Sequence, residues 1–181
     1  LKRLEEAGLP PGVINFVPGD APTVTDVVLS SRDLAGIHFT GSTEVFRAIW
    51  RQVGERIDHY RSYPRLVGET GGKDFIVAHS SADPLEVAVA VVRGGFEYQG
   101  QKCSAASRVF VPQSLWSATR DHILEMLARV KVGDPRDFSC FMGAVIDRKA
   151  FDKIRGYIDD AKGAAGVEVI AGGTYDDSVG Y

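Results

Sequence analysis

Apolar and polar positions alternate along the chain in two patterns, short apolar runs and apolar residues at helical spacing. Short runs bounded by turn residues are typical of strands. They predict strands over Val13–Val17, Gly36–Gly41, Arg65–Glu69, Asp74–His79, Ser107–Val111 and Val167–Gly172. Helical spacing of apolar residues and helix-start signals predict helices over Leu1–Ala7, Asp20–Ser31, Thr43–His59, Asp83–Tyr98, Ser114–Val130 and Arg148–Lys162.

The order of these elements predicts the fold class. Strands and helices alternate in the first part of the chain, which favours an α/β fold with parallel strands and right-handed crossovers. Glycines gather between Val67 and Gly72. We therefore expect a domain boundary there, with residues 1–68 in one domain and residues 69–181 in the next.

Composition and charge narrow the class of protein. The chain has 181 residues, 44% of them hydrophobic and 25% charged, and a net charge of −3, which fits a globular protein with a core. No basic run indicates nucleic-acid or membrane-surface binding, and no apolar run is long enough to span a bilayer. Two cysteines, Cys103 and Cys140, and four scattered histidines give no zinc-ligand spacing, so we expect no metal site and free thiols in a reducing compartment.

The segment FTGST, residues 39–43, places a Gly and a hydroxyl residue between a predicted strand and a predicted helix. The free N–H groups and the dipole at a helix N-terminus favour an anion such as a phosphate. Ser42 as an ordinary helix N-cap explains the same residues. Both interpretations stay open from the spacing alone.

The segment GETGGKDF, residues 68–75, ends a predicted strand in glycines. A phosphate-binding P-loop would need Gly at position 67 and Ser or Thr at position 74, where the chain has Val67 and Asp74. The P-loop is therefore excluded. Glu69 remains a candidate general base, or equally a solvated surface carboxylate.

Cys103 lies in QGQKCSAAS, a polar segment between a predicted helix and a predicted strand. Such a loop can present a thiol to a cleft, and Lys102 and nearby backbone N–H groups would favour the nucleophilic thiolate. An incidental loop cysteine is the alternative. Cys140 lies between Phe138 and Phe141, which favours a packing role.

Together, FTGS, E-x-GGK and G-Q-x-C occur in the order and at the spacing found in the aldehyde dehydrogenase superfamily, which the chain resembles over essentially its whole length. RLVGETGGKDF and FEYQGQKCSAASRVFVP, with Phe46 where most relatives carry Gly, resemble the branch that oxidises glutamate γ-semialdehyde in proline breakdown. The resemblance implies parallel sheets with helices on both faces. Residues 1–68 would then be the C-terminal part of a Rossmann-like NAD-binding domain, and residues 69–181 the N-terminal part of the catalytic domain.

The resemblance also implies roles for single residues. Cys103 would be the catalytic nucleophile, and Glu69 would activate the water that hydrolyses the thioester. Ser104 would bind the α-carboxylate of the semialdehyde. Ser42 would bind the pyrophosphate of NAD, with Gly41 giving it room, Gly19 on the adenosine side and Gly71 beside the nicotinamide. NADP is not distinguished from NAD.

The same resemblance places further parts of the machinery outside this chain, so we expect a piece of a larger protein that is inactive alone and exposes apolar surface. We expect the full-length protein to be a cytoplasmic homo-oligomer, with the mitochondrial matrix as the alternative compartment, and to bind neither nucleic acid nor membranes. Two other functions stay open. One is oxidation of another semialdehyde or aldehyde, and the other is a non-catalytic binding module, against which the retained Cys103 and Glu69 argue.

Overall fold

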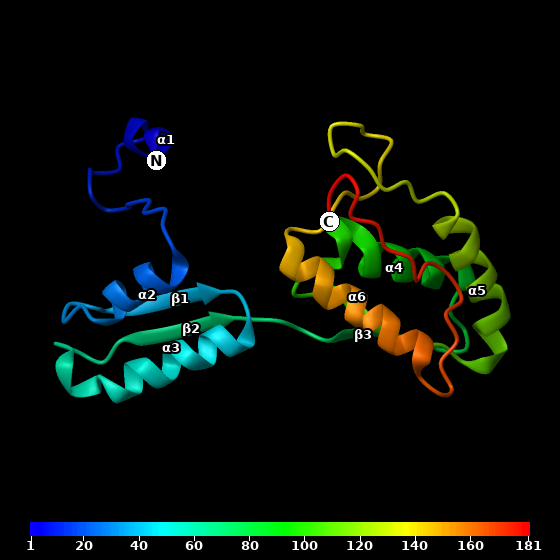
Figure 1. The fold of residues 1–181 in the computed structure, drawn as a ribbon, viewed down its shortest axis with the longest axis horizontal. Helices are drawn as coiled ribbons and strands as arrows, with labels where there is room; N and C mark the ends of the chain where they lie inside the picture. Colours follow the sequence, from blue (N-terminus) through cyan, green and yellow to red (C-terminus); the bar gives the residue numbers. More distant parts are fainter. The chain divides into compact units, whose positions relative to one another are not determined.

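The computed structural model describes residues 1–181, which form two compact units, Leu1–Thr70 and Gly71–Tyr181. Each unit contains its own two-stranded parallel sheet, β1–β2 in the first and β3–β4 in the second (Figure 1). Strands paired in parallel and joined by helices confirm the predicted α/β class.

The first unit runs α1, α2, β1, α3, a short 3₁₀ helix η1 and β2. Helix capping explains where its two main helices begin, because Asp20 accepts a hydrogen bond from the N–H of Thr23 and Ser42 accepts one from the N–H of Val45. Its elements have the bounds α1 Lys2–Glu6, α2 Ala21–Leu29, β1 Gly36–Thr40, α3 Thr43–Glu55, η1 Ile57–His59 and β2 Arg65–Glu69.

The core of the first unit lies between α2, α3 and one face of the sheet. Leu29 of α2 packs with Ile49 and Val53 of α3. The alternation of β1 turns Ile37 and Phe39 toward this core, while the intervening positions are exposed. The sheet is thereby anchored to its helices through every second residue of β1.

The second unit runs β3, α4, a short 3₁₀ segment η2, β4, α5 and α6. As predicted, α4 begins at an Asp-Pro pair, where the Asp83 carboxylate accepts hydrogen bonds from the N–H groups of Leu85 and Glu86. Its elements have the bounds β3 Asp74–Val77, α4 Pro84–Phe96, η2 Glu97–Gly100, β4 Ala106–Phe110, α5 Gln113–Leu127 and α6 Arg148–Gly163.

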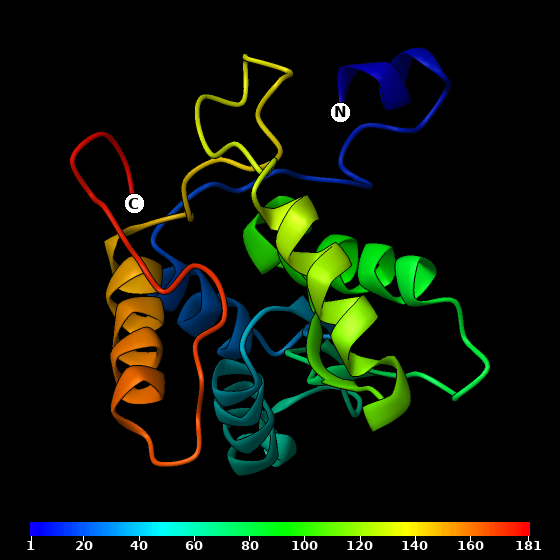
Figure 2. The ribbon, with the colours of Figure 1, turned by 90° about the vertical axis from the view of Figure 1, so that its right-hand side faces the viewer.

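Helices α4 and α5 lie side by side, and their contact forms the core of the second unit (Figure 2). Ala88 and Val92 of α4 pack there against Ile123 of α5. The C-terminal segment returns along α6, where Asp177 pairs with Arg148 at 2.6 Å and the Tyr175 hydroxyl donates to Asp159 at 3.1 Å.

Two strand predictions are wrong. Residues Val13–Val17 and Val167–Gly172 form no strand in the structure. A strand needs a neighbour for its backbone groups, and neither β1–β2 nor β3–β4 has a third strand. The apolar run 13–17 is instead exposed, with Phe16 at 78% of its full accessible surface.

Candidate active site

The carboxyl edge of the β1–β2 sheet brings two of the sequence motifs together. Thr40 and Glu69 are paired residues at the ends of the two strands. Just beyond them, the N–H of Gly41 donates to the Glu69 carbonyl oxygen at 3.1 Å. FTGS and the start of GETGG therefore lie side by side within the first unit, at the edge where α/β sheets usually bind ligands.

The N-terminus of α3 begins directly at this edge. Ser42 satisfies one of the four N–H groups that a helix start leaves open, since its Oγ accepts from Val45, and its carbonyl accepts the first bond within the helix, from Phe46. The N–H groups of Thr43 and Glu44 remain for another acceptor. The arrangement fits an anionic group such as a pyrophosphate, and the exposed Glu44 side chain is free to turn toward solvent.

Aromatic side chains pack next to this helix start. The Phe46 ring stacks on the Phe39 ring with their centroids 5.9 Å apart, and it meets the Trp50 ring edge-on with their centroids 5.7 Å apart. Phe46 also occupies the space beside Gly68 of β2. Phe46 thus closes the apolar side of the same edge.

Gly19 lies in the exposed loop before α2. A side chain there would meet the side chain of Val24 at 3.0 Å. The next residue, Asp20, caps α2, and its hydrogen bonds to Thr23 hold the pKa of its carboxyl below the ordinary value.

In the second unit, Cys103 sits at the tip of a tight turn. The N–H of Ala105 donates to the Lys102 carbonyl at 3.2 Å, which leaves Cys103 and Ser104 as the two central residues. Both are exposed. The N–H of Cys103 makes no hydrogen bond within the chain, so both the thiol and this donor are open to a ligand.

The glycine pair of GETGGKDF reaches this turn. A side chain at Gly72 would run into the Cys103 carbonyl oxygen, well inside van der Waals contact. Arg108 fixes the same stretch by donating to the Lys73 carbonyl at 3.0 Å. Gly71, in contrast, has open space around its Cα. The structure therefore brings Gly72 of GETGGKDF next to Cys103 of QGQKCSAAS.

Lys102 does not direct its charge at the thiol. Its ammonium donates to Glu97 at 2.9 Å, and Glu97 also accepts from Arg93 at 2.7 Å. The hydrogen bond from Lys102, followed by that from Arg93, holds the pKa of the Glu97 carboxyl below its ordinary value. An ion pair with Glu97 thus replaces the expected thiolate-stabilising role of Lys102. The five-residue spacing of Glu97 and Lys102 permits this pair, but the sequence alone did not identify it.

Sequence reasoning also missed the backbone that precedes the turn. Tyr98, Gln99 and Gly100 all have left-handed dihedrals, with φ of 56°, 58° and 67°. Each non-glycine residue held this way costs roughly 1–3 kcal/mol, and such residues gather at functional sites. The one available signal was Gly100, since glycine is the residue that adopts this region freely.

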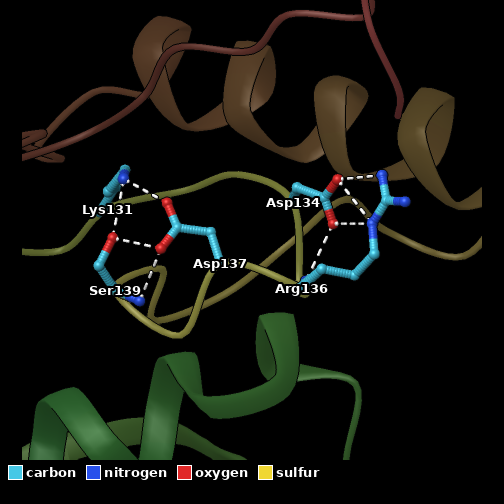
Figure 3. Close-up of polar contacts among 5 residues, drawn as sticks. All are labelled: Lys131, Asp134, Arg136, Asp137 and Ser139. Atoms are coloured by element: carbon cyan, nitrogen blue, oxygen red, sulfur yellow. Dashed lines mark hydrogen bonds and ion pairs between the residues drawn. The ribbon is translucent and has the colours of Figure 1, made fainter.

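Cys140, the second cysteine, lies in the loop that links α5 to α6. It is half-buried against Gly133, as the predicted packing role requires, but its neighbour Phe138 is 98% exposed rather than packed. A polar network replaces apolar packing in this loop: the Asp137 carboxylate accepts from Lys131 at 2.6 Å and from the Ser139 hydroxyl at 2.7 Å (Figure 3). The Lys131 ammonium is the first cause that lowers the pKa of Asp137 to about 2.

The structure contains no group of His, Cys, Asp and Glu side chains suited to a metal ion. None of its helices combines the length and the apolar character that crossing a membrane requires.

Comparison with known proteins gives one consistent result. The model of the aldehyde dehydrogenase family matches residues 1–181. The mitochondrial Δ1-pyrroline-5-carboxylate dehydrogenase of Danio rerio is 49% identical over 181 residues, which cover 99% of this chain and 33% of that protein. This chain thus spans about a third of the length of such relatives.

Solved structures agree with the sequence relatives. The Δ-pyrroline-5-carboxylate dehydrogenase of Mycobacterium tuberculosis is similar with a TM-score of 0.94 and 56% identity, covering 99% of this chain and 33% of that one. The same Mycobacterium tuberculosis protein bound with NAD also gives a TM-score of 0.94, with 99% of this chain and 34% of that chain covered. The likeness to these structures confirms the predicted fold type.

Proposed function

The chain belongs to the aldehyde dehydrogenase family, and on this premise we propose that its full-length protein oxidises L-glutamate γ-semialdehyde to L-glutamate with NAD. The substrate is the open-chain form of Δ1-pyrroline-5-carboxylate. Relatives named as dehydrogenases of that compound, at 49% and 56% identity, support this choice, and an NAD-bound relative supports the cofactor.

The two predicted domains, whose boundary lies next to the end of the first unit at Thr70, would divide the work. We assign residues 1–68 to the NAD-binding domain and residues 69–181 to the catalytic domain. The N-terminus of α3 supports the first assignment, because its open N–H groups fit a pyrophosphate. The exposed Cys103 turn supports the second.

Four residues would hold NAD. Ser42 would donate its hydroxyl hydrogen to the pyrophosphate, since its oxygen already accepts from Val45. Gly41 would keep the approach to that helix start free of a side chain. Gly19 would lie along the adenosine and Gly71, with open space around it, along the nicotinamide. NAD, when bound, supplies the acceptor for the hydride that leaves the substrate carbon.

Cys103 would carry the covalent chemistry. Its thiolate attacks the aldehyde carbon and forms a C–S bond, while the carbonyl oxygen becomes an oxyanion that accepts from the free N–H of Cys103. Loss of hydride from that carbon leaves a thioester. Ser104, exposed beside the nucleophile, would donate its hydroxyl hydrogen to the α-carboxylate of the substrate.

Glu69 would complete the cycle. Its carboxylate takes a proton from water, the resulting hydroxide adds to the thioester carbon, and the C–S bond breaks to release glutamate and the thiol. A carboxylate kept close to the thiolate would oppose its formation, so we infer that Glu69 approaches only for this hydrolysis.

A single observation carries the proposal: the cysteine of the family motif stands exposed at a turn with a free backbone N–H beside it. The test is steady-state oxidation by the full-length protein of glutamate γ-semialdehyde, succinate semialdehyde and a simple aldehyde. We expect the highest kcat/KM for the first and no measurable turnover for Cys103→Ser. Preference for another aldehyde overturns the substrate, and an active Cys103→Ser overturns the mechanism.

Two further proposals concern the full-length protein in the cell. We place it as a homo-oligomer in the cytoplasm, with the mitochondrial matrix as the alternative that the Danio rerio relative represents. It would need neither nucleic acid nor a membrane. Light scattering on the purified protein tests the oligomer, and fractionation of source cells tests the compartment.

A further inference from the structure

The left-handed run Tyr98–Gly100 ends three residues before Cys103 and needs something to hold it. Two consecutive non-glycine residues with φ of 56° and 58° persist only where their surroundings fix them. Gly100 cannot be exchanged, because a side chain there would lie 2.9 Å from the Gly95 carbonyl oxygen and φ is 67°. The contacts that fix this run therefore also fix the start of the thiol turn.

Two glutamine side chains make those contacts. Gln99 donates from Nε2 to the Ala144 carbonyl oxygen at 2.9 Å. Gln101 accepts at Oε1 from the Ile146 N–H at 3.0 Å. Both bonds reach across 45 residues of sequence to one short segment, Gly143–Ile146, which directly precedes α6.

The receiving segment offers one acceptor and one donor two residues apart, the Ala144 carbonyl and the Ile146 N–H, and the two glutamines bind both. The residue between them, Val145, donates its N–H to the Tyr181 carbonyl at 2.7 Å. The segment is thus bonded to the thiol loop by Ala144 and Ile146, and to the C-terminal residue by Val145.

We propose that Gln99 and Gln101 are positioning residues, a clamp that holds the Cys103 turn against the Gly143–Ile146 segment. This rests on the proposed function. The clamp fixes the chain at Gln101, two residues before Cys103. Gly72, in the connection between β2 and β3, packs against the Cys103 carbonyl. Between them they set the directions of the thiol and of the Cys103 N–H, which must both reach one carbonyl group.

The two glutamines have opposite hydrogen-bonding roles, which makes the clamp testable. Gln99 must donate, and Gln101 must accept. A glutamate at 99 would place a carboxylate against a carbonyl oxygen and break the bond. A glutamate at 101 adds the same charge, even closer in sequence to Cys103, but keeps the acceptor.

The experiment uses the full-length protein with Q99M, Q101M, Q99E and Q101E, and with Q113M at the exposed start of α5 as the matched control. Misplacement of a reacting group by about 1 Å costs about 100-fold, so we expect Q99M and Q101M to lower kcat by about 10- to 100-fold. KM for the aldehyde and Kd for NAD should change by less than about threefold, since the clamp touches neither ligand. Q101E should retain clearly more activity than Q99E, and Q113M should match the parent.

A second readout separates positioning from general damage. Alkylation of Cys103 by iodoacetamide should change in rate in Q99M and Q101M, with an unchanged pH midpoint, because an amide carries no titrating charge. Alkylation of Cys140 in the same samples reports on folding. If Q99M fails to fold, the comparison of Q101E with Q101M still decides, and if Q101M fails to fold, the comparison of Q99E with Q101E does.

Equal losses in Q99E and Q101E, or kcat within twofold of the parent in both methionine variants, would overturn the clamp. The proposed function fails separately, when the parent oxidises no aldehyde or Cys103→Ser remains active. In that case the alkylation rates still show whether the two glutamines hold the turn.

Discussion

The carbonyl oxygen of Cys103 occupies the space where a side chain of residue 72 would begin. Two motifs that are far apart in sequence, GETGGKDF and QGQKCSAAS, meet at this close approach and in the pairing of Asp74 with Ala106. Glycine at 72 is therefore explained by close approach of a backbone rather than by an unusual dihedral angle.

Gly72→Ala should displace the Cys103 turn, because the obstructing atom is backbone and cannot swing away. We expect kcat of the full-length protein to fall by about 10- to 100-fold through misplacement of the thiol. Steady-state kinetics and the rate of Cys103 alkylation measure this. Gly156→Ala is the matched control: it lies inside α6 with open space around it, so it should leave activity intact and stabilise the helix by about 0.5–1 kcal/mol. Normal activity of Gly72→Ala would contradict the packing.

Glu69→Gln should slow thioester hydrolysis more than hydride transfer. Loss of a general base lowers the rate of its own step by about 10²- to 10⁴-fold. Stopped-flow absorbance should therefore show a near-normal first burst of NADH followed by a slow steady state. Glu55→Gln, an exposed carboxylate at the far end of α3, is a charge-matched control for the thiol step. An equal loss in burst and steady state would count against the role of Glu69.

Lys131→Met should raise the pKa of Asp137 from about 2 toward its ordinary 3.8, because the Lys131 hydrogen bond is the largest cause of the shift. The lowered pKa means that the bonded carboxylate stabilises the loop above pH 3.8 and that this contribution disappears as pH falls through about 2. At pH 3.5 Asp137 should be ionised in the parent and protonated to a greater extent in the variant, in which the hydrogen bonds from Ser139 remain. Carboxyl ¹³C shifts read this directly. Lys153→Met, on exposed α6, should leave the Asp137 signal unchanged.

Tyr60→Phe should destabilise the first unit. The buried Tyr60 hydroxyl donates to the Leu29 carbonyl at 2.8 Å, where α2 ends in the core. Its removal leaves a buried acceptor unpaired, which costs roughly 1–3 kcal/mol. Urea unfolding measures the loss of stability, and hydrogen exchange of the amides in α2 shows that it lies in the first unit. Tyr63→Phe removes a hydroxyl from a side chain that is 84% exposed and should change nothing.

Sequence reasoning succeeded where the signal was local. Asp83 before Pro84 and Ser42 before Thr43 each marked a helix start that the structure confirms, because a cap is satisfied within its own first turn. The short run Gly36–Gly41 likewise placed β1. The end of α3 was less well predicted, since the chain passes into the 3₁₀ helix η1 after Glu55.

Sequence reasoning failed where the structure of a segment depends on partners that are distant in the sequence. Val13–Val17 is as apolar as β1, but strand formation depends on a neighbour that composition does not reveal. The hydrogen bonds of Gln99 and Gln101 depend on Ala144 and Ile146, 45 residues away. Lys102 was a candidate for favouring the thiolate because it is next to Cys103 in sequence, whereas its ammonium pairs with Glu97.

Both sheets have only two strands, so each has outer edges whose backbone N–H and C=O groups are unpaired. Such edges recruit strands from other molecules. A recombinant polypeptide of these 181 residues is therefore expected to aggregate by intermolecular β-pairing, even in dilute buffer. Co-expression with a complementary segment that supplies adjoining strands should keep it in solution.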